Sequence, residues 1–380
     1  MKRRSAMLLG AALASLSGCS NATLPLPSAP IPSAAPSTTS SASPDAATPV
    51  PSRPAATLSP DDAFLDKVPG SLRLMTYNVN WDSIFPEDDP LNHELRAFDR
   101  EDSFRRILRA VRPDIVCLQE INYFRKDREL ADFVERLLGA PEGEVWQVAH
   151  VADDVIATRF ELREEGYELV TGSILTNLDQ AAALVDLPDE PYGPTDLYLI
   201  CSHFKSGGSP DDIRLRLRQA DVIMAHVRDF ETPGEHLDLP DVTPFVILGD
   251  FNAYATEPAR HLETLFEGDI YDEQRYGVDL NPDWDGTELQ DARPSHNGLE
   301  IRYFTWRDDS GPFIPGALDR VIFSDSVMTL RNAFVLNTRL LTDEALAAHG
   351  LERDDVLLDP ASGNYDHFPV VVDFSMGSTP

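Results

Sequence analysis

The chain has 380 residues, of which 42% are hydrophobic and 25% are charged, and this composition excludes a collagen-like or a wholly disordered protein. Its 64 acidic residues outnumber its 32 lysines and arginines, which gives a formal net charge of -32. A protein that coats nucleic acid through overall basicity is therefore excluded, whereas a local basic groove is not. Three cysteines are too few to form a disulfide framework in a chain of this length.

The N-terminus predicts an export signal. Three cations at positions 2–4 precede an apolar run from Ala6 to Leu16, which is too short to span a bilayer. The Leu-Ser-Gly-Cys sequence that ends this segment resembles the bacterial lipobox, in which the cysteine is diacylated and becomes the first residue of the mature protein. We therefore expect residues 1–18 to be a lipoprotein signal peptide and Cys19 to carry the lipid. An ordinary cleavage site beside an unmodified cysteine would give a secreted protein instead.

The next segment, residues 19–61, predicts a disordered linker. It consists almost entirely of Pro, Ser, Ala and Thr, so it cannot bury a core and is typical of an extended tether that is partly polyproline II. No later run reaches the roughly 18 apolar residues of a membrane helix, so we expect a lipid anchor. The expected location is the cell envelope, outside the cytoplasm.

The remaining residues, 62–376, predict one globular domain. Apolar residues at helical spacing predict a helix from Asp102 that stops before Pro113, and two more over 129–138 and 210–230. The predicted strands are 71–79, 114–119, 144–151, 154–158, 168–175, 181–187, 197–202, 244–248, 301–306, 317–323, 330–336 and 369–374, with a polar loop over 277–298. Many strands with few helices and no break in composition indicate one mixed α/β (α+β) domain of two packed sheets with helices outside.

Polar side chains follow most of the buried strands. They are Asn78, Glu120, His203, Asp250, Asn252, Asp319, Asp366 and His367. A single acid after a strand is usually a turn residue or a helix cap. Because so many residues of metal-binding and phosphate-binding type recur at strand ends, we interpret them together as a catalytic site.

The sharpest motif is the Gly-Asp-Phe-Asn sequence after the strand that ends at Leu248. In extended backbone, Asp250 and Asn252 face the same side, and Gly249 has no side chain to block a close approach. A carboxylate and an amide would then share one ligand.

These residues resemble the GDxN motif of the endonuclease/exonuclease/phosphatase superfamily. The other motifs of the superfamily follow in order as TYN, LQE, SHF, LDR and DHFPV, so the resemblance spans residues 72–374. It implies the four-layered α/β/β/α sandwich of deoxyribonuclease I-like proteins, with the site at the strand ends. It also implies a divalent-metal-dependent hydrolase of phosphoester bonds.

Two carboxylates are the expected metal ligands. Glu120 and Asp366 offer hard oxygen atoms of the kind that Mg²⁺ prefers, and the superfamily places its metal there, with Mn²⁺ or Ca²⁺ as alternatives. Asn78 is expected to orient Glu120 or Asp250. Adjacent Asp366 and His367 would point to opposite sides of a regular strand, so that one binds metal while the other faces phosphate.

The catalytic roles are expected to fall on histidines and acids. The superfamily pairs Asp319 with His367, and His203 is implied to contact the scissile phosphate or the leaving group. Asp250 and His367 are alternative general bases, while Asn252 would stabilise charge in the transition state. Three acids, Asp153, Asp154 and Glu161, are candidates by position for the partner of His203.

Cations near the site are the candidate phosphate contacts. Lys205 and Arg218 are assigned this role, and Arg218 with Gln219 resembles an Arg-Gln pair of the superfamily. The glycines after Lys205 would offer backbone amides to an anion. Where many members have an arginine, this chain has Asp179 and Gln180, with Arg159 as a candidate replacement.

Cys117 and Cys201 lie in apolar strands, where we expect buried free thiols, although a disulfide could form between them in an oxidising compartment.

The activity that we expect first is that of a nuclease-like phosphodiesterase, because the HFKS and GDFNAY segments resemble those of secreted nucleases. The alternatives are a phosphatase or a lipid phosphodiesterase that acts on sphingomyelin or phosphoinositide. A catalytically inert binding module would have lost one of Glu120, Asp250, Asn252 and His367, and all four are present. We expect the chain to be a monomer. Its expected partners are the membrane and a substrate that is a nucleic acid or a small phosphodiester.

Overall fold

The computed structural model describes residues 62–86, 89, 91, 98–163, 178, 180–234, 237, 239–240, 242–254, 259–299 and 302–376. The chain divides into two units, Met1–Ala56 and Thr57–Pro380, and every described residue lies in the second. The predicted signal peptide, Cys19 and the linker lie outside the described residues, as does the predicted strand 168–175. Within the described ranges, no helix has the length and apolar character needed to cross a membrane.

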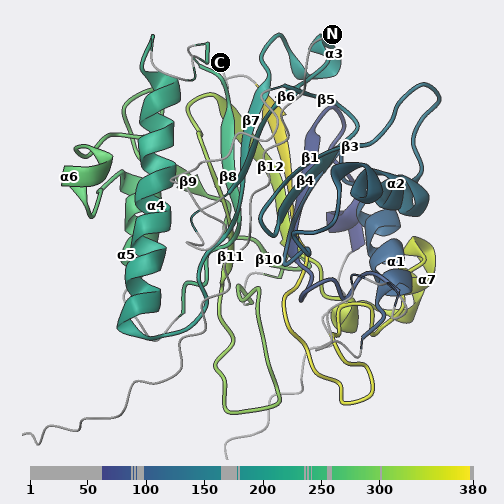
Figure 1. Cartoon of the computed structure of the whole chain (residues 1–380). Helices are drawn as coiled ribbons and strands as arrows, with labels where there is room; N and C mark the ends of the chain where they lie inside the picture. The colour runs from purple at the N-terminus through teal and green to yellow at the C-terminus, as the bar shows by residue number, and fades with distance from the viewer. Residues whose placement is uncertain are drawn as a thin grey trace, which may run out of the picture. The chain divides into compact units, whose positions relative to one another are not determined.

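Two sheets form the centre of the domain (Figure 1). The seven-stranded sheet contains, from edge to edge, β10 (Ser295–His296), β12 (Met328–Val335), β13 (Val370–Met376), β1 (Leu72–Asn78), β2 (Ile115–Gln119), β4 (Asp154–Thr158) and β3 (Gln147–Val151). The six-stranded sheet contains β5 (Glu161–Arg163), β6 (Ala181–Asp186), β7 (Leu197–His203), β8 (Phe245–Asp250), β11 (Asp319–Phe323) and β9 (Gln290–Asp291). In the seven-stranded sheet β1 pairs with β2 in parallel, and in the six-stranded sheet β7 pairs with β8 in parallel. The carboxyl ends of each pair therefore lie side by side, and they are the strand ends nearest the site.

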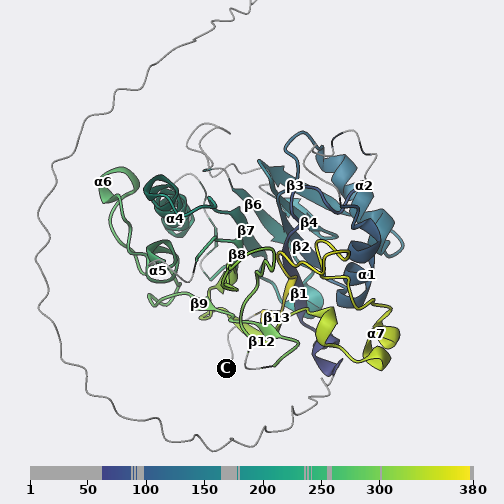
Figure 2. The same cartoon turned by 90° about the horizontal axis from the view of Figure 1, so that it is seen from below.

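Helices cover the outer face of each sheet (Figures 1 and 2). Beside the seven-stranded sheet lie α1 (Glu101–Val111), α2 (Asp127–Leu138) and α7 (Asp343–His349), and beside the six-stranded sheet lie α4 (Pro210–Glu231), α5 (Arg260–Glu267) and α6 (Glu273–Tyr276). Short helical turns are α3 (Asp189–Tyr192), Asp62–Leu65 and Thr338–Leu340. The resulting order of helices, sheet, sheet and helices confirms the expected four-layered sandwich.

Strand alternation distributes the core between the layers. In β7 and β8, Leu199 and Val246 belong to the hydrophobic cluster between the two sheets, whereas Ile200 and Ile247 belong to the cluster under α4. Because both faces of these strands are buried, their sequences are continuously apolar instead of alternating with polar residues. The first polar side chains therefore come where the strands end, which is where the site lies.

Several expectations from the sequence are wrong, among them the polar loop over 277–298, which contains the two-residue strands β9 and β10. The predicted strand over 301–306 is absent from its described part, 302–306, where Trp306 makes only isolated bridge pairings, with Gly316 and His367. Its aromatic-rich sequence is typical of a strand, but these residues do not join a ladder. The helices α5 and α7 were not predicted, since helices of 8 and 7 residues carry too few turns for a clear apolar period.

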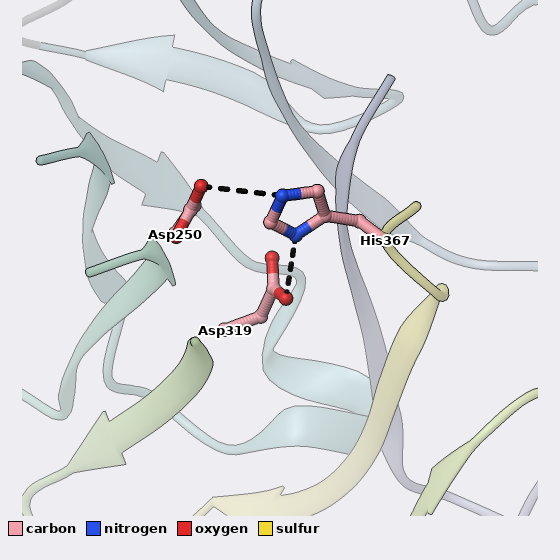
Figure 3. Close-up of side chains that lie close together, drawn as sticks. All are labelled: Asp250, Asp319 and His367. Atoms are coloured by element: carbon pink, nitrogen blue, oxygen red, sulfur yellow. Dashed lines mark hydrogen bonds and ion pairs between the residues drawn. The ribbon is translucent and has the colours of Figure 1, made fainter. Parts of the chain in front are cut away.

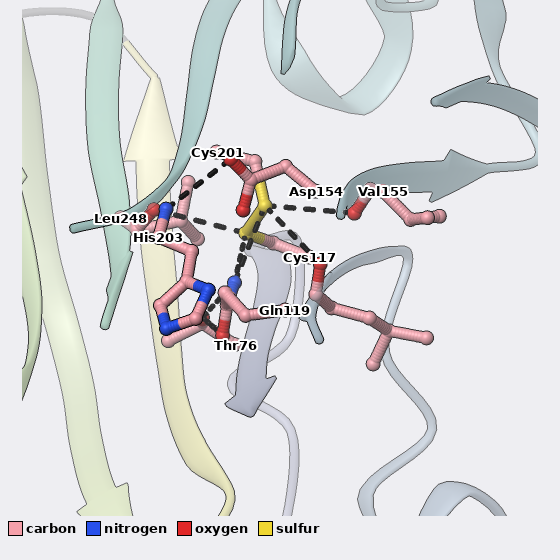
Figure 4. Close-up of a disulfide and its surroundings, with 9 residues drawn as sticks. Thr76, Cys117, Gln119, Asp154, Val155, Cys201, His203 and Leu248 are labelled. Atoms are coloured by element: carbon pink, nitrogen blue, oxygen red, sulfur yellow. Dashed lines mark hydrogen bonds between the residues drawn. A yellow bond between two sulfur atoms is a disulfide. The ribbon is translucent and has the colours of Figure 1, made fainter. Parts of the chain in front are cut away.

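The expectation of buried free thiols is also wrong. Cys117 of β2 and Cys201 of β7 form a disulfide that joins the two sheets, with 5.9 Å between their Cα atoms (Figure 4). Both residues are almost completely buried, and the side-chain amide of Gln119 lies within 3.3 Å of both sulfur atoms. The pairing follows from the sandwich, because two strands from different sheets present their inward faces to each other. Both cysteines are close in sequence to predicted site residues, Glu120 and His203.

Candidate active site

The predicted site residues gather around the carboxylate of Asp250 at the end of β8. Strand pairing places His203 of β7 and Asp319 of β11 directly opposite Asp250 on its two sides. The Asp250 side chain is about 1% exposed. The other sheet contributes Asn78, whose side-chain amide donates a hydrogen bond of 3.1 Å to Asp250 Oδ2. Both sheets of the sandwich therefore build one cluster.

Asp250 is a fixed hydrogen-bond acceptor with two imidazoles beside it. Besides Asn78, the backbone and side-chain amides of Asn252 donate to it over 2.9 and 3.2 Å. The Nε2 atoms of His367 and His203 lie 3.5 and 3.7 Å from Asp250 Oδ2. These amide donors fix the position of the Asp250 carboxylate.

His367 is held by the expected partner, Asp319 (Figure 3). Its Nδ1 atom lies 2.9 Å from Asp319 Oδ2, and the Nε2 atom faces Asp250. Burial acts to lower the pKa of His367, but the charges of Asp319, Asp250 and Asp366 outweigh burial and raise that pKa well above its usual value. The surrounding carboxylates therefore favour the protonated form of His367.

His203 has its own acid partner, Asp153. The Nδ1 atom of His203 lies 2.7 Å from Asp153 Oδ2, while the neighbouring Asp154 accepts a hydrogen bond of 3.2 Å from the His203 backbone. Burial acts to lower the pKa of His203, but nearby charges, of which Asp153 has the largest effect, raise it to about 10. Of the three candidate acids, Asp153 is thus the side-chain partner, and Glu161 is an exposed residue of β5.

Glu120 lies beside this cluster with one oxygen atom unused. Its Oε1 accepts a hydrogen bond of 3.0 Å from Asn78, so Asn78 bridges Glu120 and Asp250. Its Oε2 is buried and has no hydrogen-bond partner. The backbone of Glu120 adopts a φ of 63°, a strained left-handed conformation that directs the residue away from the line of β2. Burial raises the pKa of Glu120.

Asp366 is held by two side chains that the sequence did not single out. Asn80 donates a hydrogen bond of 2.8 Å to Asp366 Oδ2, and the indole of Trp306 donates one of 3.1 Å to Oδ1. The charge of Asp366 also acts to raise the pKa of Glu120, which places the two carboxylates within electrostatic range of each other. Asp366 and its neighbour His367 bond to different partners, as expected from their adjacency.

Two groups of residues fit a metal ion. Ligand atoms of Asp250, Asp319 and His367 lie within 4.8 Å of one another. In that group, however, both ring nitrogens of His367 are engaged, because Nδ1 bonds to Asp319 and Nε2 faces Asp250. The unpartnered Oε2 of Glu120 is a free hard ligand of the kind that Mg²⁺ or Ca²⁺ takes.

Asn252 lies just beyond the end of β8, in a left-handed turn with a φ of 49°. Its side-chain nitrogen donates to Phe204 O and to Asp250, and its side-chain oxygen accepts a hydrogen bond of 3.0 Å from Tyr254. The turn replaces the extended backbone that the sequence analysis assumed, yet it still brings Asn252 onto Asp250. A Cβ at Gly249 would lie 2.0 Å from Ser202 O, so the close approach that glycine permits here is that of β7.

The loop between β7 and α4 carries the candidate phosphate contacts. Lys205 is about one third exposed, and its ammonium lies 3.9 Å from Asp212. Gln219 accepts a hydrogen bond from the Lys205 backbone and donates one to His203 O, so it shapes the loop. Arg218, its neighbour, has a buried Nε atom without a hydrogen-bond partner.

Buried Arg216 bonds to the carbonyls of Lys205 and Gly207, a role in shaping the loop that the sequence analysis missed. Arg159 pairs with Asp114 and Glu144 and so does not replace a phosphate contact. Gln180 is buried with neither side-chain polar atom bonded, and Asp179 lies outside the described residues.

Asn80, Trp306 and Tyr254 are the site residues that sequence reasoning missed. Asn80 follows Asn78 by two positions, and Tyr254 follows Asn252 by two, so a wider view of each motif would have included them. No local signal marked Trp306, which lies 60 positions from its acceptor Asp366.

The chain is similar to one known protein family and to several solved structures. A profile described as the Endonuclease/Exonuclease/phosphatase family matches residues 75–343. No curated protein matches the chain significantly. Similar solved structures include the human nocturnin catalytic domain with bound sulfate, at 18% identity and a TM-score of 0.47 over 82% of this chain and 96% of that chain.

Two further structures are similar to the chain to the same degree. One is D. rerio TDP2 complexed with a single-strand DNA product, at 13% identity and a TM-score of 0.45 over 80% of this chain and 99% of that chain. The other is ANGEL2, a 2',3'-cyclic phosphatase, in complex with adenosine-2',3'-vanadate, at 15% identity and a TM-score of 0.48 over 81% of this chain and 97% of that chain.

Proposed function

Because the chain belongs to the endonuclease/exonuclease/phosphatase family, we propose that it is a divalent-metal-dependent phosphodiesterase that works at the Asp250 cluster. One observation carries the proposal. Two buried imidazoles, each backed by its own carboxylate, face one carboxylate that amide groups hold in place. Such an arrangement places a proton acceptor between two cations, which suits water attack on an anionic phosphoester.

Glu120 and Asp366 are the proposed metal ligands. The buried Oε2 of Glu120, which has no hydrogen-bond partner, and the electrostatic effect of Asp366 on Glu120 support this pair. A bound Mg²⁺, Mn²⁺ or Ca²⁺ would supply a Lewis acid that stabilises charge on the phosphate oxygens. Asn78 and Asn80 would orient the two carboxylates, since each donates a hydrogen bond to one of them.

Asp250 is the proposed general base. The sequence left Asp250 and His367 as alternatives, but both ring nitrogens of His367 face carboxylates, Nδ1 that of Asp319 and Nε2 that of Asp250, and these charges raise the pKa of His367. We therefore assign Asp250 to accept the proton from water, and His367 and His203 to bind phosphate oxygens or to protonate the leaving group. Both side-chain donors of Asn252 are engaged, with Phe204 and with Asp250, so we assign Asn252 to hold the base in place.

We propose small phosphodiesters and short oligonucleotides as substrates. The net charge of -32 opposes the many phosphate contacts by which long nucleic acids gain affinity. A phosphatase and a lipid phosphodiesterase remain the alternatives, and Lys205 and Arg218 are the proposed phosphate contacts in each case.

The proposed location is the outer side of a cell membrane, with the lipid on Cys19 as anchor. The buried disulfide between Cys117 and Cys201 supports a compartment outside the cytoplasm, because disulfides of this kind persist where thiols are oxidised.

Turnover of defined substrates tests the function. Purified protein is assayed with bis(p-nitrophenyl) phosphate, a short oligonucleotide, p-nitrophenyl phosphate and sphingomyelin vesicles, each with Mg²⁺, Mn²⁺ or Ca²⁺ and with excess chelator. We expect hydrolysis of the first two, abolished by the chelator. Asp309→Asn, a change of an exposed carboxylate, is the matched control for Asp250→Asn. Full activity in the chelator, or in Asp250→Asn, would contradict the proposal.

A further inference from the structure

A second cavity lies beside the candidate active site and shares one residue with it. Its volume is about 570 Å³, which is within the usual range for sites that bind small molecules. Its polar wall consists of Arg293, Tyr303, Thr305, Asp319 and Arg320, with proline and alanine side chains supplying apolar surface. Of these residues only Asp319 belongs to the cluster around Asp250.

Two of the lining residues, Arg293 and Arg320, are cations in a chain whose net charge is -32, and the one lining carboxylate, Asp319, is paired with His367. Arg320 donates a hydrogen bond of 2.7 Å to Asp291, and the Arg293 guanidinium lies 3.9 Å from the same carboxylate. The Asp291 carboxylate is the shared counterion of the Arg293 and Arg320 guanidinium groups, so one of their two positive charges is not neutralised by Asp291. Arg293 is 78% exposed and can turn toward a ligand. The electrostatics therefore favour an anion.

Two buried polar atoms of the wall residues are unsatisfied. Arg320 Nε and Asp319 Oδ1 are both buried, and neither has a hydrogen-bond partner. Leaving such atoms unpaired typically costs on the order of 1–3 kcal/mol each, more for charged groups. A ligand with both an anionic acceptor and an N–H or O–H donor would satisfy them.

An aromatic ring completes the cavity. Tyr303 is 51% exposed and lines the cavity together with Pro294. An exposed tyrosine ring beside a proline offers a flat surface on which a planar ring can stack. Charge, unpaired polar atoms and ring together match a small molecule that joins a planar heterocycle to a phosphate group.

We propose that this cavity binds a nucleoside monophosphate or a closely similar ring-bearing phosphate, and that occupation lowers turnover at the neighbouring site. The second part rests on the proposed function. Asp319 explains the coupling, because its Oδ2 holds His367 while the same carboxylate lines the cavity with its buried Oδ1. A ligand donor bonded to Oδ1 draws negative charge from the carboxylate and weakens its hold on His367.

Calorimetric titration tests the binding site. Adenosine monophosphate is titrated into the intact protein in excess chelator, so that a metal-dependent site does not contribute. We expect Arg293→Asn, which suits the left-handed backbone at this position, and Tyr303→Ala each to weaken binding at least about tenfold. Arg214→Ala, which removes an exposed arginine of α4, is the matched control and should bind as the parent does. Equal affinity in the parent, Arg293→Asn and Tyr303→Ala would overturn the proposal, as would absence of binding to the parent.

A second pair of measurements separates this cavity from the Asp250 cluster. Adenosine monophosphate should bind to Asp250→Asn as it does to the parent, and loss of binding in that variant would overturn the proposal. With bis(p-nitrophenyl) phosphate as substrate, the nucleotide should lower kcat and leave KM unchanged. Purely competitive inhibition would overturn the coupling. If the protein does not hydrolyse this substrate, the proposed function fails, while the calorimetric result still decides whether the cavity binds the nucleotide.

Discussion

Removing the disulfide between the sheets should destabilise the domain strongly. The variant with both Cys117→Ala and Cys201→Ala keeps the buried positions apolar, so its main effect is loss of the cross-link. The two cysteines are 84 positions apart in the sequence, and closing a loop of that length in the unfolded chain accounts for about 4.5 kcal/mol in the chain-entropy model. Domains of this kind typically have free energies of unfolding of about 5–15 kcal/mol, so the variant should lose a large share of its stability.

The loss should also reach the active site. The disulfide connects β2 to β7, the strands that end beside Glu120 and His203. We therefore expect the double variant to lose activity at a lower temperature than the parent, with kcat near that of the parent well below its own Tm. This pattern would separate a stabilising role from a direct part in the chemistry.

Urea unfolding followed by tryptophan fluorescence measures the free energy. The control is the parent protein unfolded and refolded with a reductant, which should show the same loss as the double variant. Thiol titration of the unreduced, unfolded parent should find neither cysteine free. Two free thiols, or a change in the free energy of unfolding below about 1 kcal/mol, would refute this reasoning.

Four further predictions follow from particular residues. Glu120→Ala should raise the Mg²⁺ concentration needed for half-maximal turnover, and Asp250→Asn should lower kcat on the order of a hundredfold or more. An unchanged Mg²⁺ requirement in the first variant together with a loss under about fivefold in the second would place the site elsewhere. Burial lowers the pKa of His296 to about 4, so the folded protein is stabilised relative to the unfolded chain above about pH 6.5, and this stability is lost as the pH falls toward 4. Between pH 7 and pH 5, the free energy of unfolding of His296→Gln should therefore fall by about 2 kcal/mol less than that of the parent in urea unfolding. Equal falls in the two proteins would contradict this prediction. Cys19→Ser should release the protein from membranes, and membrane retention of this variant would count against the lipid anchor. Deletion of residues 20–60 should leave Tm and turnover unchanged, and a lower Tm would count against the linker assignment. Binding of long duplex DNA should depend weakly on salt, whereas a log-log slope of about -4 or steeper would show a basic track along α4 and favour an ordinary nuclease.

The sequence by itself determined the layers of the fold and most of the side chains that gather at the candidate site. Strands such as β8 are apolar on both faces because they lie between two layers, and a run of this kind ends where the first polar residue appears. Asp250 and His203 were therefore visible as polar residues at strand ends, and parallel pairing of β7 with β8 brought them together. Local pattern and strand direction were sufficient for this part of the site.

Only the tertiary structure decided which partners these residues have. Three nearby acids were equivalent by position as partners of His203, and the fold selects Asp153, which lies 50 positions away in the sequence. Asn80 reaches Asp366 across 286 positions, and Cys117 meets Cys201 across the two sheets. Spacing along the chain carries no information about such pairs, because they depend on how the two sheets pack face to face. The cavity that Asp319 shares with Arg293 and Arg320 exists for the same reason, since its wall is built from segments that meet only in the folded chain.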